Sequence, residues 1–211
     1  MLGWVPACDN LGAMKTAIIL HGKPSKEEYL DPNSPSPSNA HWLAWLQRQL
    51  LLYGILAQTP ELPEPYEPDY EKWSAVFQQF PIDADTMLVG HSCGAGFLVR
   101  WLSEHRIQVG KVALVAPWID PSHNRARAMF DGLHIDGDLA ARTRGVELFI
   151  SSDDSQEVLT SAALLESTMK GVYLRRFSDR GHFTSGDMKT EGFPELREML
   201  IPAEPTAAIC R

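Results

Sequence analysis

The sequence predicts an α/β fold, with a six-stranded, mainly parallel β-sheet and helices on both of its faces. Two observations support this prediction. Short apolar segments that suit β-strands alternate six times with segments whose apolar residues recur at helical spacing. The first apolar segment, residues 16–20, is apolar almost throughout, which is typical of a parallel strand buried on both sides. Because parallel strands are joined by right-handed crossovers, the intervening helices are expected to cover both faces.

The expected elements follow in order along the chain. Strands are predicted at residues 16–20, 54–58, 87–89, 111–116, 146–151 and 172–177. Helices are predicted from residue 39 or 40 to 52, at 70–80, through 97–102, and at 124–130, 138–142, 156–169 and 193–200. Asn39 and Asp69 are the expected N-caps of the first two helices. Residues 23–40 contain four prolines and are expected to form a long loop.

Length and composition indicate a single globular domain. The chain has 211 residues, of which 44% are hydrophobic and 22% are charged. We expect the domain to span residues 14–201, between a flexible leader at 1–13 and a flexible tail at 202–211. Met14 lies just before the first strand, which makes it an alternative to Met1 as the biological start.

Charge and hydropathy exclude several classes of partner. The net charge is −8 and no basic run is present, so nucleic acid is not an expected partner. No apolar run approaches the roughly 20 residues that a membrane helix needs. The N-terminus lacks the basic start of a secretory signal, and three cysteines do not form a disulfide framework. These features favour the cytoplasm, and they assign no oligomeric state.

The segment from Gly90 to Gly94 reads Gly-His-Ser-Cys-Gly and fits the pattern G-x-S-x-G. Such a pattern between a strand and a helix is typical of a tight turn that exposes a strained, nucleophilic serine, here Ser92. The two flanking glycines avoid collisions between the arms of the turn. Gly96 is expected to let the following helix lie close to a neighbouring strand. The sequence therefore predicts Ser92 as the nucleophile.

A serine nucleophile needs a base, and the base needs an acceptor that orients it. Among seven histidines, His182 is the candidate base because it follows the last predicted strand in a loop that can reach Ser92. Asp153 and Asp154 follow the fifth strand, and both are candidates for the acid. Asp120, after the fourth strand, is a rival. Asp179 is too close in sequence to His182 and is expected to organise its loop instead.

An oxyanion hole needs two N–H donors near the developing charge. The backbone N–H of Cys93, directly after the nucleophile, is one expected donor, and Gly22 or Lys23, after the first strand, supplies the other. The Cys93 thiol itself is expected to be incidental.

The residues that follow the strands also suggest which side chains line the pocket. His21, Trp118 and His91 are the candidates for substrate binding, although the ring of His91 should point away from Ser92. Neither a metal-ligand cluster nor a nucleotide-binding motif is present, so no metal or cofactor is predicted.

The order serine, acid, histidine is that of α/β-hydrolases. Residues 90–95, the run Ser-Asp-Asp at 152–154 and Gly-His-Phe at 181–183 resemble the small serine hydrolases that include retinoblastoma-binding protein nine and its bacterial relatives. The resemblance extends from about residue 16 to 200. It implies an α/β-hydrolase fold with strand order 2-1-3-4-5-6 and no large lid, and it selects Asp154 as the acid. His-Gly-Lys-Pro at 21–24 departs from the glycine-rich run of the family, and Ser-Gln at 155–156 departs from its apolar stretch.

The predicted function is hydrolysis of a small carboxylic ester through an acyl-enzyme on Ser92. The same triad also serves amidases, peptidases and thioesterases, so a small ester or amide is the expected partner. A third possibility is a non-catalytic protein-binding module on this fold, which the presence of serine, acid and histidine argues against.

Overall fold

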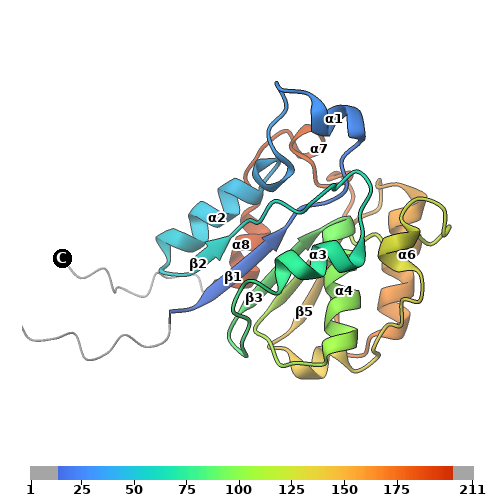
Figure 1. Cartoon of the computed structure of the whole chain (residues 1–211). Helices are drawn as coiled ribbons and strands as arrows, with labels where there is room; N and C mark the ends of the chain where they lie inside the picture. The colour runs from blue at the N-terminus through green and yellow to red at the C-terminus, as the bar shows by residue number, and fades with distance from the viewer. Residues whose placement is uncertain (1–13, 202–211) are drawn as a thin grey trace, which may run out of the picture.

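The structure is a computed structural model that describes residues 14–201, and the predicted leader and tail lie outside these residues. One parallel sheet runs through its centre (Figure 1). Its strands are β1 (Thr16–Leu20), β2 (Leu56–Gln58), β3 (Met87–His91), β4 (Val112–Val115), β5 (Val146–Ser151) and β6 (Tyr173–Phe177). They lie in the order β2-β1-β3-β4-β5-β6, and all five pairs are parallel. The predicted fold and strand order are confirmed.

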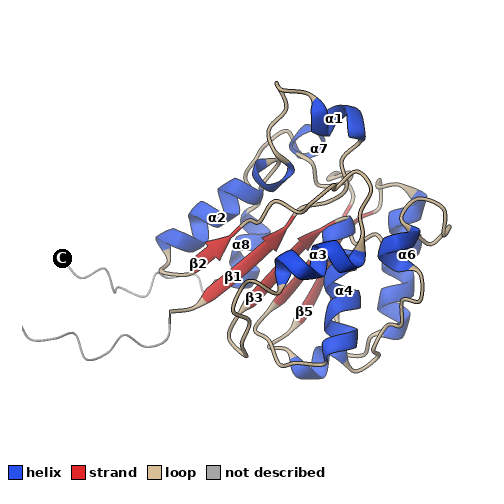
Figure 2. Cartoon of the chain, in the orientation of Figure 1, coloured by secondary structure: helices blue, strands red, loops and turns tan. Residues whose placement is uncertain are grey.

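Helices cover both faces of the sheet (Figure 2). They are α1 (Lys26–Leu30), α2 (Leu43–Leu52), α3 (Tyr70–Phe77), α4 (Cys93–His105), α5 (Arg127–Phe130), α6 (Gln156–Thr168), α7 (Ser185–Met188) and α8 (Pro194–Leu200), with short 3₁₀ turns η1 (Pro37–Asn39) and η2 (Leu139–Arg142). α2 and α8 lie on one face, and α3, α4 and α6 lie on the other. The connection from β1 to β2 runs along the sheet in the opposite direction to the later connections, so right-handed crossovers place α2 on the opposite face from α3, α4 and α6. α1 and α7 lie beyond the carboxyl ends of the strands.

The core is centred on β3, β4 and α4. Every residue of β3 and β4 is buried, as is nearly all of α4. Burying one large aliphatic side chain contributes roughly 1.5–3 kcal/mol, so these central elements form a stable base for the turn between β3 and α4. A second aromatic group, Phe149, Phe177, Phe183 and Phe193, packs the loop after β6 against α8. Phe183 is fully buried, and this fixes the segment that carries His182.

The start of α2 differs from the sequence prediction. Asn39 does not cap this helix; it ends η1, where its side-chain amide donates to Ser36 Oγ (2.9 Å). His41 then takes a left-handed φ of 56°, which interrupts any continuous helix between the two elements. α2 therefore begins only at Leu43, with Trp42 in the N-cap position.

Two other helices follow the prediction in part. Asp69 does cap α3, because its Oδ1 accepts from the backbone N–H of Lys72 (3.0 Å). The helix expected at 124–130 is shortened to α5, since the N–H groups of Arg125 and Ala126 donate to Asp120 Oδ2 instead. The predicted loop at 23–40 contains α1 and η1.

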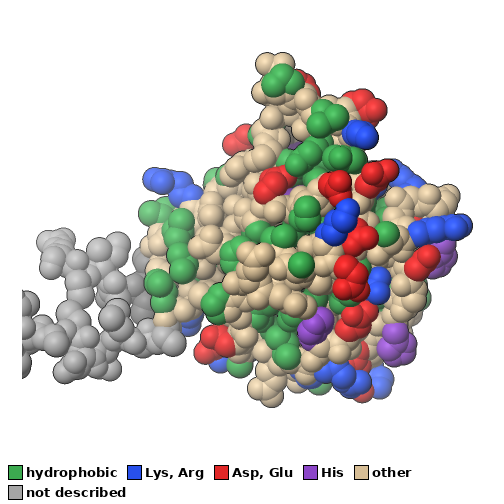
Figure 3. Space-filling view, in the orientation of Figure 1, with side chains coloured by type: hydrophobic (Ala, Val, Ile, Leu, Met, Phe, Trp, Pro, Cys, Tyr) green, Lys and Arg blue, Asp and Glu red, His purple; other side chains and the backbone are tan. Residues whose placement is uncertain are grey.

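The surface shown in Figure 3 carries acidic and basic side chains that are interspersed with one another. Between residues 14 and 201, no helix is both long enough and apolar enough to cross a membrane.

Candidate active site

Ser92 stands at the tip of the turn between β3 and α4. Its backbone has φ 54° and ψ −119°, a strained conformation for a residue with a side chain. The turn is tight enough to require glycine on both sides. A Cβ on Gly90 would lie 2.6 Å from Ala95 Cα, and a Cβ on Gly94 would lie 2.3 Å from the carbonyl oxygen of His21. The G-x-S-x-G pattern therefore forms the strand–turn–helix that the sequence predicts.

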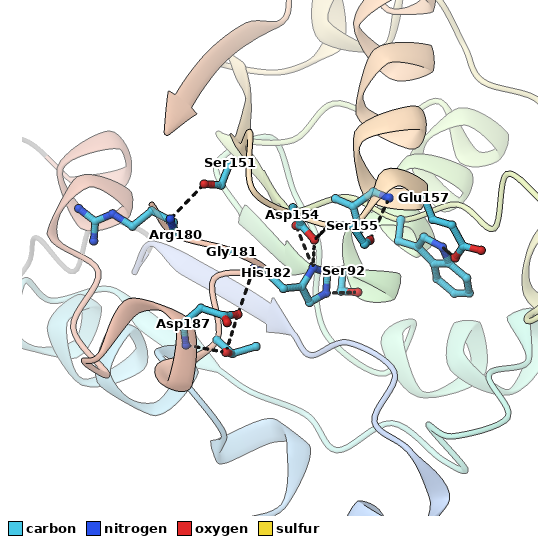
Figure 4. Close-up of polar contacts among 12 residues, drawn as sticks. Ser92, Ser151, Asp154, Ser155, Glu157, Arg180, Gly181, His182 and Asp187 are labelled. Atoms are coloured by element: carbon cyan, nitrogen blue, oxygen red, sulfur yellow. Dashed lines mark hydrogen bonds and ion pairs between the residues drawn. The ribbon is translucent and has the colours of Figure 1, made fainter. Parts of the chain in front are cut away.

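His182 and Asp154 extend from Ser92 in one hydrogen-bonded line (Figure 4). His182 Nε2 lies 2.9 Å from Ser92 Oγ, and His182 Nδ1 lies 3.0 and 3.1 Å from the two Asp154 oxygens. An ionised carboxylate only accepts, so Nδ1 carries the proton and Nε2 is free to take one from the serine. The Asp154 side chain is 3% exposed, which keeps this contact away from water.

The other candidate acids have different partners. Asp153 Oδ1 accepts from the N–H of Gly181 (3.0 Å) and from Ser151 Oγ, and these contacts lower the pKa of its carboxyl. Asp120 is fully buried and binds the backbone of the segment before α5. Asp179 is largely exposed, and its carboxylate lies 3.5 Å from Nε of the Arg180 guanidinium. The geometry thus brings Asp154, and none of these three, to His182.

The loop that carries His182 is held by two residues that no sequence pattern assigned to this task. Asp187 Oδ2 accepts from the backbone N–H of His182 (3.0 Å). His91 Nε2 donates to the carbonyl oxygen of His182 (2.8 Å), and the two rings lie 5.1 Å apart. Asp187 and Asp153 therefore organise this loop in place of Asp179. A Thr-x-x-Asp pattern at 184–187, in which Thr184 caps α7, is the sequence signal that could have indicated Asp187.

The expected oxyanion donors, the N–H of Cys93 and that of Gly22 or Lys23, lie beside Ser92. The N–H groups of Cys93 and Lys23 donate to no acceptor within residues 14–201. A Cβ on Gly22 would lie 2.9 Å from Ser92 Cβ, so glycine allows the loop after β1 to approach the nucleophile. The assignment of these N–H groups to an oxyanion hole stays a prediction. Burial raises the pKa of the Cys93 thiol, which keeps it protonated and unreactive.

Two cavities open beside Ser92. The first, of about 220 Å³, is lined by α1 and by the loop after β1, together with His41 and His91. The second, of about 290 Å³, is lined by Trp118, Arg125 and the start of α6. Ser92, Lys23 and His182 line both cavities. A bond held over Ser92 can therefore direct its two ends into separate cavities.

Two of the three predicted substrate-binding residues, Trp118 and His21, differ in their placement. Trp118 lines the second cavity, and its indole N–H donates to Glu157 Oε2 (3.1 Å). His21 lines the first cavity but is 2% exposed. Both its ring nitrogens are occupied, because Nδ1 donates to the carbonyl of Gly22 (2.8 Å) and Nε2 accepts from the N–H of Leu62 (3.0 Å). His21 is thus better suited to fixing the cavity wall than to contacting a substrate.

His41 is a wall residue to which no sequence pattern points. Its ring lies 5.7 Å from that of His91, at the first cavity. Within residues 14–201, no group of three or more His, Cys, Asp or Glu side chains is arranged to hold a metal ion.

A parallel sheet in this order, with a strained serine after β3 and a histidine after β6, defines an α/β-hydrolase. The model of a protein family described as "Serine hydrolase" matches residues 33–200. The chain belongs to this family.

Individual proteins are similar to this chain in sequence or in fold. The chain is 29% identical over 183 residues to "Putative hydrolase YdeN" of Bacillus subtilis (strain 168), a match that covers 82% of this chain and 91% of that protein. The crystal structure of the ydeN gene product superimposes with a TM-score of 0.71, at 24% identity, over 88% of this chain and 96% of that one. Est1E from Butyrivibrio proteoclasticus, solved with ferulic acid bound, has the same fold, with a TM-score of 0.60 at 12% identity, over 88% and 86% of the two chains.

Proposed function

We propose that the protein hydrolyses a small carboxylic ester through an acyl-enzyme on Ser92. The observation that carries this proposal is the line from Ser92 Oγ through the His182 ring to the buried Asp154 carboxylate. A serine becomes a nucleophile when a base removes its proton, and an acidic partner keeps that base in the required tautomer. All three side chains are in hydrogen-bonding contact without rearrangement.

In the first half of the reaction, Ser92 Oγ attacks the ester carbonyl carbon as its proton passes to His182 Nε2. The carbonyl electron pair moves to oxygen, where the N–H of Cys93 and that of Gly22 or Lys23 would stabilise the charge. Asp154 stabilises the imidazolium that forms. Collapse of the intermediate breaks the bond to the leaving alcohol, which takes the proton from His182.

In the second half, water takes the place of the alcohol. His182 Nε2 removes a proton from this water, whose oxygen attacks the acyl carbon. The second tetrahedral intermediate uses the same donors, and its collapse returns the proton to Ser92 Oγ and releases the acid. The two cavities on either side of Ser92 would hold the acyl and alcohol parts.

The sizes of the cavities support a small substrate. Cavities of about 220 and 290 Å³ suit short acyl and alcohol groups better than a long chain. The structurally similar Est1E holds ferulic acid, a carboxylic acid, which is the kind of product that ester hydrolysis yields.

Hydrolysis of 4-nitrophenyl acetate and butyrate by single variants tests the proposal. Ser92→Ala and His182→Ala should lower kcat by roughly 10⁴-fold or more, since the triad acts as a unit. Asp154→Asn should lower kcat strongly, because the amide can impose the wrong tautomer. Asp153→Asn is the matched control and should retain more activity. A folded Ser92→Ala variant with wild-type turnover would refute the proposal, and a greater loss in Asp153→Asn would reassign the acid.

A further inference from the structure

Lys23 occupies the point at which the two cavities meet. It follows Gly22, whose missing side chain lets the loop after β1 lie against Ser92. Lys23 is half-buried and lines both cavities together with Ser92 and His182. Burial raises the pKa of the Cys93 thiol, and the positive charge of Lys23 lowers it by a smaller amount. The charge of Lys23 therefore acts on groups next to Ser92.

The Lys23 ammonium forms no ion pair with any carboxylate of residues 14–201. The carboxylates of the second cavity already have partners. Asp154 binds the ring of His182, and Glu157 accepts from Trp118 (3.1 Å) and from Arg125 Nη1 (3.0 Å). Lys23 is therefore the charged side chain of this cavity that is left without a partner.

The first cavity is less suited to an anion. It contains the carboxylate of Glu28 as well as Lys23. Its histidines His21, His41 and His91 all have pKa values lowered by burial, so they add no positive charge at neutral pH. Among the described residues, the Glu28 carboxylate of the first cavity has no hydrogen-bond partner and can compete for Lys23, whereas both carboxylates of the second cavity are hydrogen-bonded.

The chemistry of the second cavity suits a carboxylate. Trp118 and Val158 provide apolar walls for a short methylene or aromatic spacer. A single lysine is a point charge and matches one monovalent anion, whereas phosphate is more often held by several donors. The N–H of Cys93 and that of Gly22 or Lys23 are assigned to the oxyanion in the proposed mechanism. We propose that the second cavity binds a carboxylate carried by the substrate itself, with Lys23 as its counter-ion. This inference rests on the hydrolase function proposed above.

Matched esters that differ only in terminal charge test the inference. On the acyl side these are the 4-nitrophenyl monoester of adipic acid, its methyl-capped neutral form and 4-nitrophenyl 6-aminohexanoate. On the alcohol side, 4-acetoxybenzoate and its methyl ester provide the same comparison. The measured quantity is the ratio of kcat/KM for the anionic ester to that for the neutral one, because a general loss of activity cancels in this ratio.

In the wild type we expect this ratio to be about ten for at least one of the two pairs, as for one charge-assisted contact. Lys23→Met should bring the ratio close to one, and Lys23→Glu should favour the aminohexanoate. Lys26→Met is the control. Lys26 lies on α1 over the ring of Tyr66 and lines neither cavity, so its loss should leave the ratio unchanged.

Two results would overturn the inference alone. One is a wild type that hydrolyses the neutral esters with no preference for the anionic member of either pair. The other is a preference that survives in Lys23→Met or that Lys26→Met removes equally. A folded wild type that hydrolyses none of the esters would overturn the proposed function together with this inference.

Discussion

Among the three residues of the hydrogen-bonded line, His182 is the one carried by a loop away from any strand end. Ser92 follows β3 directly and Asp154 lies just after β5, whereas His182 is held through its own backbone. Asp187 accepts from its N–H, and His91 donates to its carbonyl. The position of the imidazole over Ser92 thus depends on hydrogen bonds to the backbone of His182 as well as on Asp154.

At the residue scale, His91→Leu should lower kcat about tenfold and leave KM nearly unchanged. The reason is that loss of the Nε2–H donor frees the carbonyl of His182 and lets the imidazole move from Ser92. His91→Gln, which keeps an N–H donor of similar reach, should restore most of kcat. Steady-state kinetics on one ester distinguish the two variants.

His105→Leu is the control for this prediction. His105 also contacts a backbone carbonyl, that of Trp101 (2.9 Å), but it stands at the end of α4, away from both cavities. Its kcat should match the wild type. Wild-type kcat in a destabilised His91→Leu protein would show that His91 serves stability alone.

At the scale of single elements, long periodic segments were predictable and short ones were not. The bounds of β1 and β5 match the prediction at both ends, because four residues of each strand are apolar. α1 and α7 were missed, since four or five residues cannot show helical periodicity. Their caps were nevertheless visible as Ser-x-x-Glu at 25–28 and Thr-x-x-Asp at 184–187, and both cap hydrogen bonds are present in the structure.

Gly96 shows how packing, which sequence alone does not reveal, decides the role of a residue. The sequence predicts that Gly96 lets α4 lie close to a neighbouring strand. A Cβ on Gly96 would instead lie 2.2 Å from the carbonyl oxygen of Trp118 and 2.8 Å from the ring of Phe130. Both neighbours belong to the segment after β4, so Gly96 holds α4 against the wall of the second cavity.

Gly96→Ala should therefore lower the free energy of unfolding by about 2–3 kcal/mol, since overpacking outweighs the helical preference of alanine. Gly192→Ala is the control, because the nearest atoms to its Cβ would lie at 3.5–3.7 Å in ordinary contact. Urea denaturation measures both. Equal stability of the two variants would contradict the packing of α4 described above.

At the scale of the whole molecule, the α/β alternation was predictable because each strand carries its own apolar pattern. Parallel strands bring their carboxyl ends to one edge, and this rule predicted that Ser92, His182 and an acid lie together there. The choice of Asp154 over Asp153 and Asp120 came from the family resemblance. The Thr-x-x-Asp pattern at 184–187 indicates the cap of α7, but neither the bond from the backbone N–H of His182 to Asp187 nor the position of His41 could be predicted. They depend on how distant loops pack over that edge, and no local sequence pattern encodes such packing.

Buried histidines make the stability of the whole molecule depend on pH. Burial lowers the pKa of His21 and His91 below the ordinary value of 6.5. For His21, burial outweighs the opposite effects of the hydrogen bond to the Gly22 carbonyl and of Glu61. Well above pH 6.5, both rings are neutral in the folded and unfolded states. Below it, the unfolded chain binds protons that the folded chain does not, so stability is lost as pH falls.

We expect the free energy of unfolding to fall from pH 6.5 to 5.5 by up to about 1.4 kcal/mol per buried histidine. Urea denaturation at pH 7.5, 6.5 and 5.5 measures this change. The variant His21→Gln/His91→Gln, compared with itself across the same range, should show a shallower slope. A wild type whose stability is constant from pH 7.5 to 5.5 would contradict the neutral, buried state of these rings.

The central claim is that Ser92 is a nucleophile activated by His182, and covalent labelling tests it most directly. The native protein is incubated with a fluorophosphonate, and its intact mass and peptide map are then determined by mass spectrometry. We predict one adduct per chain, located on Ser92, with no adduct in Ser92→Ala and much slower labelling in His182→Ala. A folded wild-type protein that remains unlabelled, or that carries its adduct on another residue, would contradict the claim.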